Sequence, residues 1–184
     1  MTSKPLPPLL LILPASNEAG LIGPCLAALL AQDAAAGPVV VIVAANACRD
    51  ATAEIARGYA PAFAARGWAL HVEDSPIPGK LAALNRAEAL AQSLAQSLGM
   101  AFGPRVWLDA DVICEPALLG QIRAVLDRPE PAWATGRLSV MPARSWVTRA
   151  YGALWTRLPF VTGGAVGAGS FAVNPPGRAR WGAF

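Results

Sequence analysis

The sequence of 184 residues is long enough for one α/β domain and too short for two full ones. Hydrophobic residues make up 54% and charged residues 15%, so the chain has ample material for a buried core. The longest aliphatic run, residues 9–13, is too short to span a bilayer, and no secretory signal pattern accompanies it. The three cysteines lack metal-ligand spacing, which argues against a zinc site and favours buried thiols in a reducing cytosol.

Strand-like and helix-like patterns alternate along the chain. Short aliphatic or β-branched runs predict strands over residues 9–14, 39–44, 68–72, 105–108, 133–140 and 170–174. Apolar residues at helical spacing predict helices over residues 21–30, 50–59, 79–98, 116–125 and 146–158. Asp50 is expected to cap the second of these helices, and the glycines of residues 163–169 to form a turn. Four strand–helix units in succession predict an α/β fold with a mainly parallel central sheet.

In such a sheet, ligands bind outside the carboxyl ends of the strands. Three of the predicted strands end in polar segments, namely residues 14–18, 45–50 and 109–111, and the loop at 78–80 precedes the long helix. These loops are expected to meet at one edge of the sheet.

Asp109 and Asp111 are two residues apart, and in extended backbone such side chains share a face. A pair of carboxylates suits Mg²⁺ or Mn²⁺, which keep bound waters and accept phosphate oxygens. Such an ion would offset charge on a leaving diphosphate, and Lys80 would add a point charge on the same phosphates. An Asp-x-Asp triplet is weak evidence by itself, but this one follows an aliphatic strand and is accompanied by other polar strand ends.

Several segments, in the right order, resemble the motifs of family 2 glycosyltransferases. They are residues 11–18, 43–56, 79–85, 109–111, 169–173 and 181–184. The first is similar to a strand that commonly reads Ile-Pro-Ala-Tyr-Asn-Glu, the third to Gly-Lys-x-x-Ala-Leu-Asn, and the fourth to the family's metal motif.

The resemblance implies a GT-A fold, a Rossmann-like three-layer sandwich around a mainly parallel sheet. It implies transfer of a sugar, with inversion, from a nucleotide-diphosphate sugar to an acceptor hydroxyl, with Mg²⁺ or Mn²⁺ as cofactor. By carry-over, the donor-binding residues are Pro14, Ala15, Asn17, Glu18, Lys80 and Asp109. Asp111, together with Asp109, would bind the metal ion.

Two positions depart from the family pattern. The family usually has an aspartate at the end of the second strand, where this chain has Ala45, and we expect the neighbouring Asn46 to contact the donor instead. An inverting enzyme also needs a general base, which the family places after a segment like residues 181–184. No acidic residue follows Glu130. We therefore expect the catalytic base beyond Phe184, in a longer natural chain.

The expected organisation is one domain over residues 1–184, with a donor-binding half at 1–111 and an incomplete acceptor-binding half at 112–184. Residues 131–184 carry six arginines and no acidic residue, a formal charge of +6 against −3 for the rest. Arginine mixed with tryptophan suits a membrane surface or a phosphate-bearing partner, although solvated surface arginines are an equal alternative. We expect a cytoplasmic protein, possible peripheral contact with the inner face of the membrane, and a lipid-linked or glycan acceptor. Nucleic acid is not an expected partner.

Two other functions fit parts of the pattern. A sugar-phosphate nucleotidyltransferase has a related fold, but it opens with a glycine-rich loop where this chain has residues 15–18. A non-catalytic nucleotide-sugar-binding module, or an inactive fragment without its base, is favoured by Ala45 and by the lack of acidic residues after Glu130.

Overall fold

The structure is a computed structural model that describes residues 6–137, 145–155, 157 and 169–182. Its strands are β1 (Leu9–Ala15), β2 (Val39–Asn46), β3 (Ala69–Ser75), β4 (Arg105–Leu108), β5 (Trp133–Ala134) and β6 (Ser170–Val173). Its helices are α1 (Ile22–Leu30), α2 (Thr52–Gly58), α3 (Ala60–Ala65), α4 (Lys80–Leu98), α5 (Leu118–Leu126), α6 (Trp146–Trp155) and α8 (Pro175–Trp181), with a 3₁₀ turn η1 (Ala34–Ala36).

The described strands form a six-stranded sheet in the order β3-β2-β1-β4-β6-β5. The pairs β1–β2, β2–β3 and β1–β4 are parallel, whereas β6 runs antiparallel to both β4 and β5. The predicted α/β class with a mainly parallel sheet is therefore confirmed.

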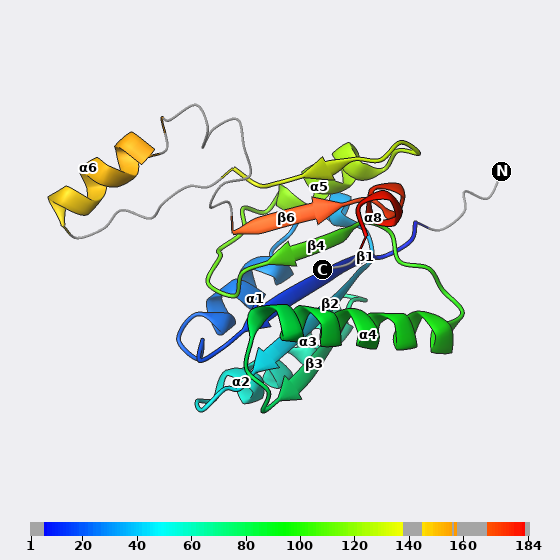
Figure 1. Ribbon diagram of the computed structural model, residues 1–184, viewed down its shortest axis with the longest axis horizontal. Coiled ribbons are helices and arrows are strands. Elements are labelled where there is room, and N and C mark those ends of the chain that lie inside the picture. Colours follow the sequence, from blue (N-terminus) through cyan, green and yellow to red (C-terminus); the bar gives the residue numbers. More distant parts are fainter. Residues whose placement is uncertain (1–5, 138–144, 156, 158–168, 183–184) are drawn as a thin grey trace.

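Helices cover both faces of this sheet, and alternate residues of β1 point into the two cores that lie between the sheet and these helices. Leu9, Leu11 and Leu13 join a core with α1, α2, α3 and α5, while Leu10 and Ile12 join a second core with α4. Figure 1 shows α4 crossing one face of the sheet. Because residues 9–13 are fully buried, the continuous aliphatic run is that of a central strand between two helical layers. Among the described residues, no helix is long and apolar enough to cross a membrane.

Several predicted boundaries are corrected. The helix predicted over 50–59 is α2, which ends at Gly58. A second short helix, α3, follows it from Ala60, with Pro61 in its first turn. Within the described residues, the strand predicted over 133–140 is only Trp133–Ala134, and 138–140 lie outside them. The end of the predicted helix 146–158 and most of the predicted glycine turn also lie outside the described residues.

Three elements were not predicted, namely α3, η1 and α8. Helix α8 is capped by Asn174, whose side chain accepts a hydrogen bond from the amide of Gly177, and two prolines occupy its first turn. The turn η1 is capped by Asp33. Asp50, predicted as a helix cap, does accept a hydrogen bond from the amide of Thr52 at the start of α2.

A buried ion-pair cluster connects three elements on the α4 side of the sheet. Glu88 on α4 accepts a hydrogen bond from Nε of Arg105 on β4 at 3.0 Å, and its other oxygen lies 3.7 Å from Arg178 on α8. The Glu88 side chain is 8% exposed, so its charge depends on these two arginines for compensation.

We predict that Glu88→Ala lowers the free energy of unfolding by about 3 kcal/mol, because it leaves Arg105 with an uncompensated, largely buried charge. Urea denaturation measures this change. The exposed pair Arg57–Asp74, with side chains 53% and 42% exposed, gives the matched control. Asp74→Ala should cost less than about 1 kcal/mol, and equal effects of the two substitutions would contradict the prediction.

Candidate functional site

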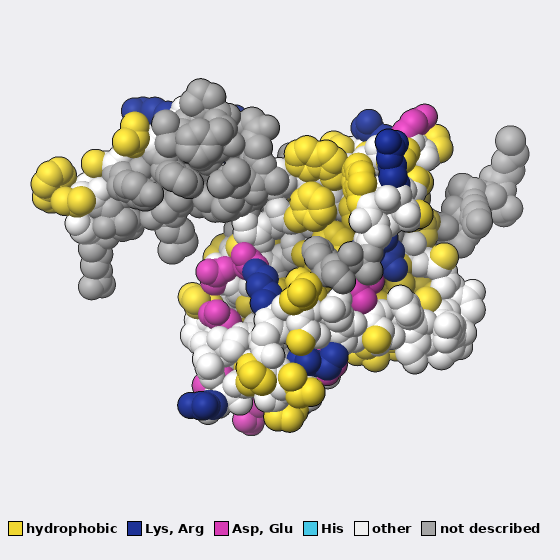
Figure 2. Space-filling model, in the orientation of Figure 1, with side chains coloured by type: hydrophobic (Ala, Val, Ile, Leu, Met, Phe, Trp, Pro, Cys, Tyr) yellow, Lys and Arg dark blue, Asp and Glu magenta, His cyan; other side chains and the backbone are white. Residues whose placement is uncertain are grey.

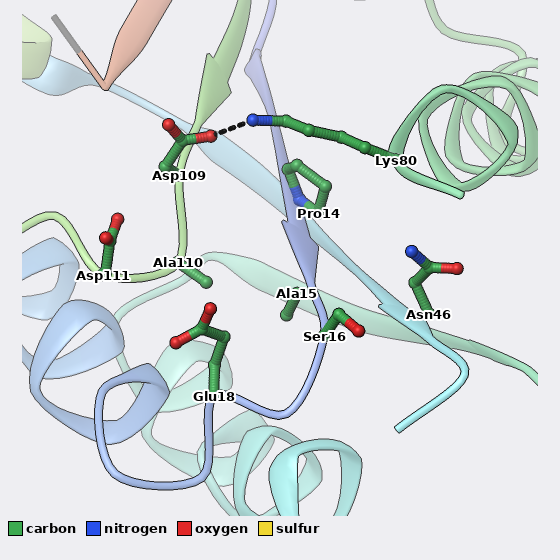
Figure 3. A pocket seen from close by; sticks show the side chains of 9 residues that line it. All are labelled: Pro14, Ala15, Ser16, Glu18, Asn46, Lys80, Asp109, Ala110 and Asp111. Atoms are coloured by element: carbon green, nitrogen blue, oxygen red, sulfur yellow. Dashed lines mark hydrogen bonds and ion pairs between the residues drawn. The ribbon is translucent and has the colours of Figure 1, made fainter. Parts of the chain in front are cut away.

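The carboxyl ends of β1, β2 and β4 meet the start of α4 around one open pocket of about 210 Å³. Its lining residues are Pro14, Ala15, Ser16, Glu18, Asn46, Lys80, Asp109, Ala110 and Asp111 (Figure 3). The structure thus brings together every predicted donor-binding and metal-binding residue except Asn17. Ser16 and Ala110 line the pocket without having been predicted.

The pocket lies where the chain order of the sheet reverses. β1 has β2 on one side and β4 on the other, so the loop that follows β1 lies between the loops that follow its neighbours. This is the topological switch point at which open α/β sheets bind ligands. Pro14 and Ala15, the last residues of β1, therefore face the same space as Asp109 and Asp111.

Opposite charges meet across this pocket. Nζ of Lys80 lies 2.5 Å from Oδ1 of Asp109, and Figure 3 shows this ion pair reaching from the start of α4 to the end of β4. The two side chains are 63% and 43% exposed. The amino terminus of the 19-residue helix α4 adds further positive potential beside Lys80.

The loop after β1 is held by hydrogen bonds to the segment after β2. Asn17 has a φ of +58°, which asparagine tolerates better than most residues, and its Oδ1 accepts a hydrogen bond from the amide of Arg49 at 2.8 Å. The amide of Glu18 donates to the hydroxyl of Thr52, and the amide of Ala19 donates to Asp50. Asn17 therefore shapes the loop, while Glu18 presents its carboxylate to the pocket (Figure 3).

Asp50 is central to this arrangement because it accepts three hydrogen bonds. The hydroxyl of Thr52 donates to it at 2.5 Å, and the amides of Ala19 and Thr52 also donate. These bonds, with the Thr52 hydroxyl contributing most, hold the pKa of Asp50 below its usual value. Sequence patterns identified Asp50 only as a helix cap and missed its bond to the loop after β1.

Asp109 and Asp111 reach the pocket through a turn and not through extended backbone, as had been expected. β4 ends at Leu108, and the amide of Val112 donates to the carbonyl of Asp109. Gly169, just before β6, supports this turn, since its carbonyl accepts a hydrogen bond from the amide of Asp109 at 2.8 Å. A Cβ on Gly169 would lie 2.6 Å from Cγ2 of Val112.

Asn46 lies at the end of β2 with only 7% of its surface exposed. Its Oδ1 is buried and receives no hydrogen bond from the described residues. Buried polar atoms are almost always paired, so an orphaned oxygen on a pocket-lining side chain favours a ligand-contacting role for this carboxamide.

Two thiols lie beneath the Asp109–Asp111 turn. Cys25 on α1 and Cys114 are buried, and the sulfur of Cys25 lies 4.0 Å from the carbonyl oxygen of Asp109. Burial, with smaller contributions from Cys114 and Asp111, raises the pKa of Cys25 to about 12, and burial raises that of Cys114 to about 11. Both therefore stay protonated and serve as packing residues, as predicted, whereas the third cysteine, Cys48, is only half-buried.

The donor set of the pocket fits a hard divalent cation. Within the part of the chain that the structure describes, no group of three or more His, Cys, Asp or Glu side chains gathers as a metal site. Asp109 and Asp111 nevertheless line one pocket, and Mg²⁺ commonly takes only one or two carboxylates from the protein, with phosphate and water completing its shell.

Comparison with known proteins agrees with this geometry. Residues 7–161 match the family model described as glycosyltransferase like family 2. The chain belongs to glycosyltransferase-like family 2. No curated protein matches the chain.

A solved mannosyltransferase structure shares its fold. The mannosyltransferase PcManGT from Pyrobaculum calidifontis, in complex with GDP-Man and Mn²⁺, aligns with a TM-score of 0.61 and 22% identity over 99% of this chain and 48% of its own. TarS 1–349 from S. aureus aligns with a TM-score of 0.49 and 22% identity over 65% of this chain and 32% of its own. This family 2 chain thus spans about half the length of PcManGT and about a third of TarS 1–349.

We predict that Gly169→Ala weakens binding of Mn²⁺ in the presence of a nucleoside diphosphate by at least about tenfold, since Val112 and the turn that carries Asp111 must shift. Titration calorimetry measures the affinity. Gly99→Ala is the matched control, because Gly99 also has a positive φ of 59° but has no atom within 4 Å of the added Cβ. Gly99→Ala should lower stability without changing affinity; an unchanged affinity in Gly169→Ala would show that this turn does not position Asp111.

Proposed function

We propose that this chain is the nucleotide-sugar-binding core of an inverting, metal-dependent glycosyltransferase. The observation that carries the proposal is the meeting of Asp109, Asp111 and Lys80 with the end of β1 in one pocket at the switch point of the sheet. Family membership supports glycosyl transfer as the reaction. PcManGT, which shares the fold, binds GDP-Man and Mn²⁺, so a nucleotide-diphosphate sugar is the proposed donor.

Asp109 and Asp111 are the proposed metal-binding residues, with Mg²⁺ or Mn²⁺ as the ion. When bound, the cation neutralises charge on the diphosphate leaving group. The two carboxylates would orient the diphosphate through this cation. They project from a turn after β4 that is hydrogen-bonded to Gly169.

Lys80 and the amino terminus of α4 form the proposed second contact with the diphosphate. The first amides of a helix have no intrahelical partners and point towards anions, and Lys80 adds a full positive charge at the same place. The diphosphate would replace Asp109 as the partner of Lys80. Their ion pair is exposed, so breaking it costs little stability.

The nucleoside is proposed to contact the ends of β1 and β2. Pro14, Ala15 and Glu18 supply one wall and the buried carboxamide of Asn46 the other. Asn17 is proposed to assist indirectly, by holding the loop that presents Glu18. An asparagine offers both a donor and an acceptor, so it can pair with a nucleobase edge that carries one of each.

The proposed division of labour follows the chain. Residues 1–111 bind the donor, and residues 112–184 begin the acceptor-binding half, with a lipid-linked or glycan hydroxyl as acceptor. In an inverting transfer the acceptor oxygen attacks the anomeric carbon opposite the diphosphate, and a general base takes the hydroxyl proton. The position of that base outside residues 1–184 stays a prediction.

One feature also favours a non-catalytic nucleotide-sugar-binding module, namely Ala45, which occupies the position where the sequence resemblance leads us to expect an aspartate. Binding of a nucleotide sugar with neither hydrolysis nor transfer to any acceptor would support the module. Transfer by the 184-residue chain would instead show that it contains its own base.

We predict that Asp111→Asn abolishes the Mn²⁺-dependent part of nucleoside diphosphate binding, a loss of at least about 100-fold, because the neutral amide is a poor ligand for a hard cation. Calorimetry with UDP or GDP, with and without Mn²⁺, provides the measurement. Asp127→Asn is the control, since Asp127 follows α5, whose Arg123 contacts the opposite end of the sheet at Pro7 and Pro38. If Asp111→Asn binds both nucleotide and metal normally, the proposed metal site is wrong.

We predict opposite effects of Lys80→Met on two affinities. Binding of Mn²⁺ alone should become several-fold tighter, because Asp109 loses its competing cation. Binding of the nucleoside diphosphate should become roughly tenfold weaker, because a phosphate contact is lost. Manganese titration followed by electron paramagnetic resonance separates the two, and Lys80→Arg should keep both affinities near those of the natural protein. Weakening of both by Lys80→Met would indicate a collapsed pocket in place of competition for Asp109.

A further inference from the structure

Helix α6 (Trp146–Trp155) is the most exposed helix among the residues that the structure describes. Figure 1 shows it standing apart from the sheet and from the helices that cover the sheet. Every α6 residue whose burial is described is exposed, including Trp146 at 70%, Val147 at 56% and Leu154 at 61%. Figure 2 shows hydrophobic side chains open to solvent at this end of the molecule.

The exposed apolar residues of α6 form one stripe. Successive helical residues turn by ~100°, so Trp146, Ala150 and Leu154 follow one another along the helix, with Val147 beside them and Arg149 on the opposite flank. A helix of ten residues is marginal in water by itself. Such a helix gains stability when its apolar stripe is covered. The exposed stripe of α6 therefore indicates a docking surface.

The charge around α6 indicates what covers it. Arg149 lies on α6, Arg144 and Arg157 stand two residues from its ends in the sequence, and no acidic residue follows Glu130. The other arginines after Glu130 lie farther from α6 in the sequence, and one of them, Arg178, pairs with Glu88. The local charge of +3 attracts anionic surfaces and repels a second copy of the same helix. Helix α6 carries tryptophan and leucine on one face and arginine at the border of that face. Helices that lie in the interface of anionic membranes have this composition. At roughly 15 Å, a ten-residue helix is half the thickness of a bilayer's hydrocarbon core.

We propose that α6 is a membrane-docking helix that lies in the plane of an anionic lipid surface, with Trp146, Val147 and Leu154 inserted among the lipids. Arg149 keeps its charged end at the headgroups while its stem stays close to the apolar stripe. This interaction goes beyond donor binding and does not depend on it, because the pocket is built from residues outside α6.

The test is co-sedimentation of the 184-residue chain with phosphatidylcholine vesicles, with and without phosphatidylglycerol. We expect the chain to bind the anionic vesicles. The affinity should fall by roughly fivefold for each arginine contact when phosphatidylglycerol is omitted, and high salt should also lower it. Leu154→Asp should lower the partition coefficient by at least about tenfold. Leu98→Asp is the matched control, since Leu98 is 64% exposed at the end of α4 and should leave the partition unchanged.

Two further measurements separate the membrane-docking proposal from the donor-binding proposal. Nucleoside diphosphate binding should be unchanged in Leu154→Asp, and vesicle binding unchanged in Asp111→Asn, so failure of one proposal leaves the other standing. The membrane proposal is overturned if the chain ignores anionic vesicles, or if Leu98→Asp and Leu154→Asp act equally. It is also overturned if size-exclusion chromatography shows a dimer that Leu154→Asp dissociates while vesicle binding is absent.

Discussion

Burial of β1 on both faces and both edges is the constraint on which the pocket depends. Residues 9–13 have no exposed surface, because helices cover both faces and β2 and β4 pair along both edges. A shift of this strand would break its hydrogen bonds to β2 and β4 at once and would move its side chains out of their places in the two cores. Pro14 and Ala15 are thereby fixed between the ends of β2 and β4, and the loops after these strands have to converge.

The pocket has more negative than positive charge, and this excess suits the proposed pair of ligands, a divalent cation and a diphosphate. Three carboxylates, those of Glu18, Asp109 and Asp111, share the lining with one lysine. A diphosphate entering this space meets repulsion that Lys80 alone does not offset, so a divalent cation and the diphosphate each improve the site for the other. The exposed Lys80–Asp109 pair is the contact that both ligands would rearrange.

Much of this arrangement is predictable from the sequence, because it depends on local patterns. Aliphatic runs mark the buried strands, and the position of Asp109 and Asp111 after one of them places both at the pocket. The turn that carries them was not predictable, because it depends on Gly169, far away in sequence. The side chain of Asn17 also escapes prediction, since a positive φ turns it towards the amide of Arg49 instead of the pocket. Helix α8 did carry a signal, an asparagine before two prolines, which is a helix start and not only a strand end.

The two halves of the sequence differ in charge as well as in proposed role. Residues 1–130, which supply the pocket, carry a formal charge of −3, whereas residues 131–184, which supply α6, carry +6. If α6 docks as proposed, an anionic surface would attract the second segment and repel the first, so its field would also orient the molecule.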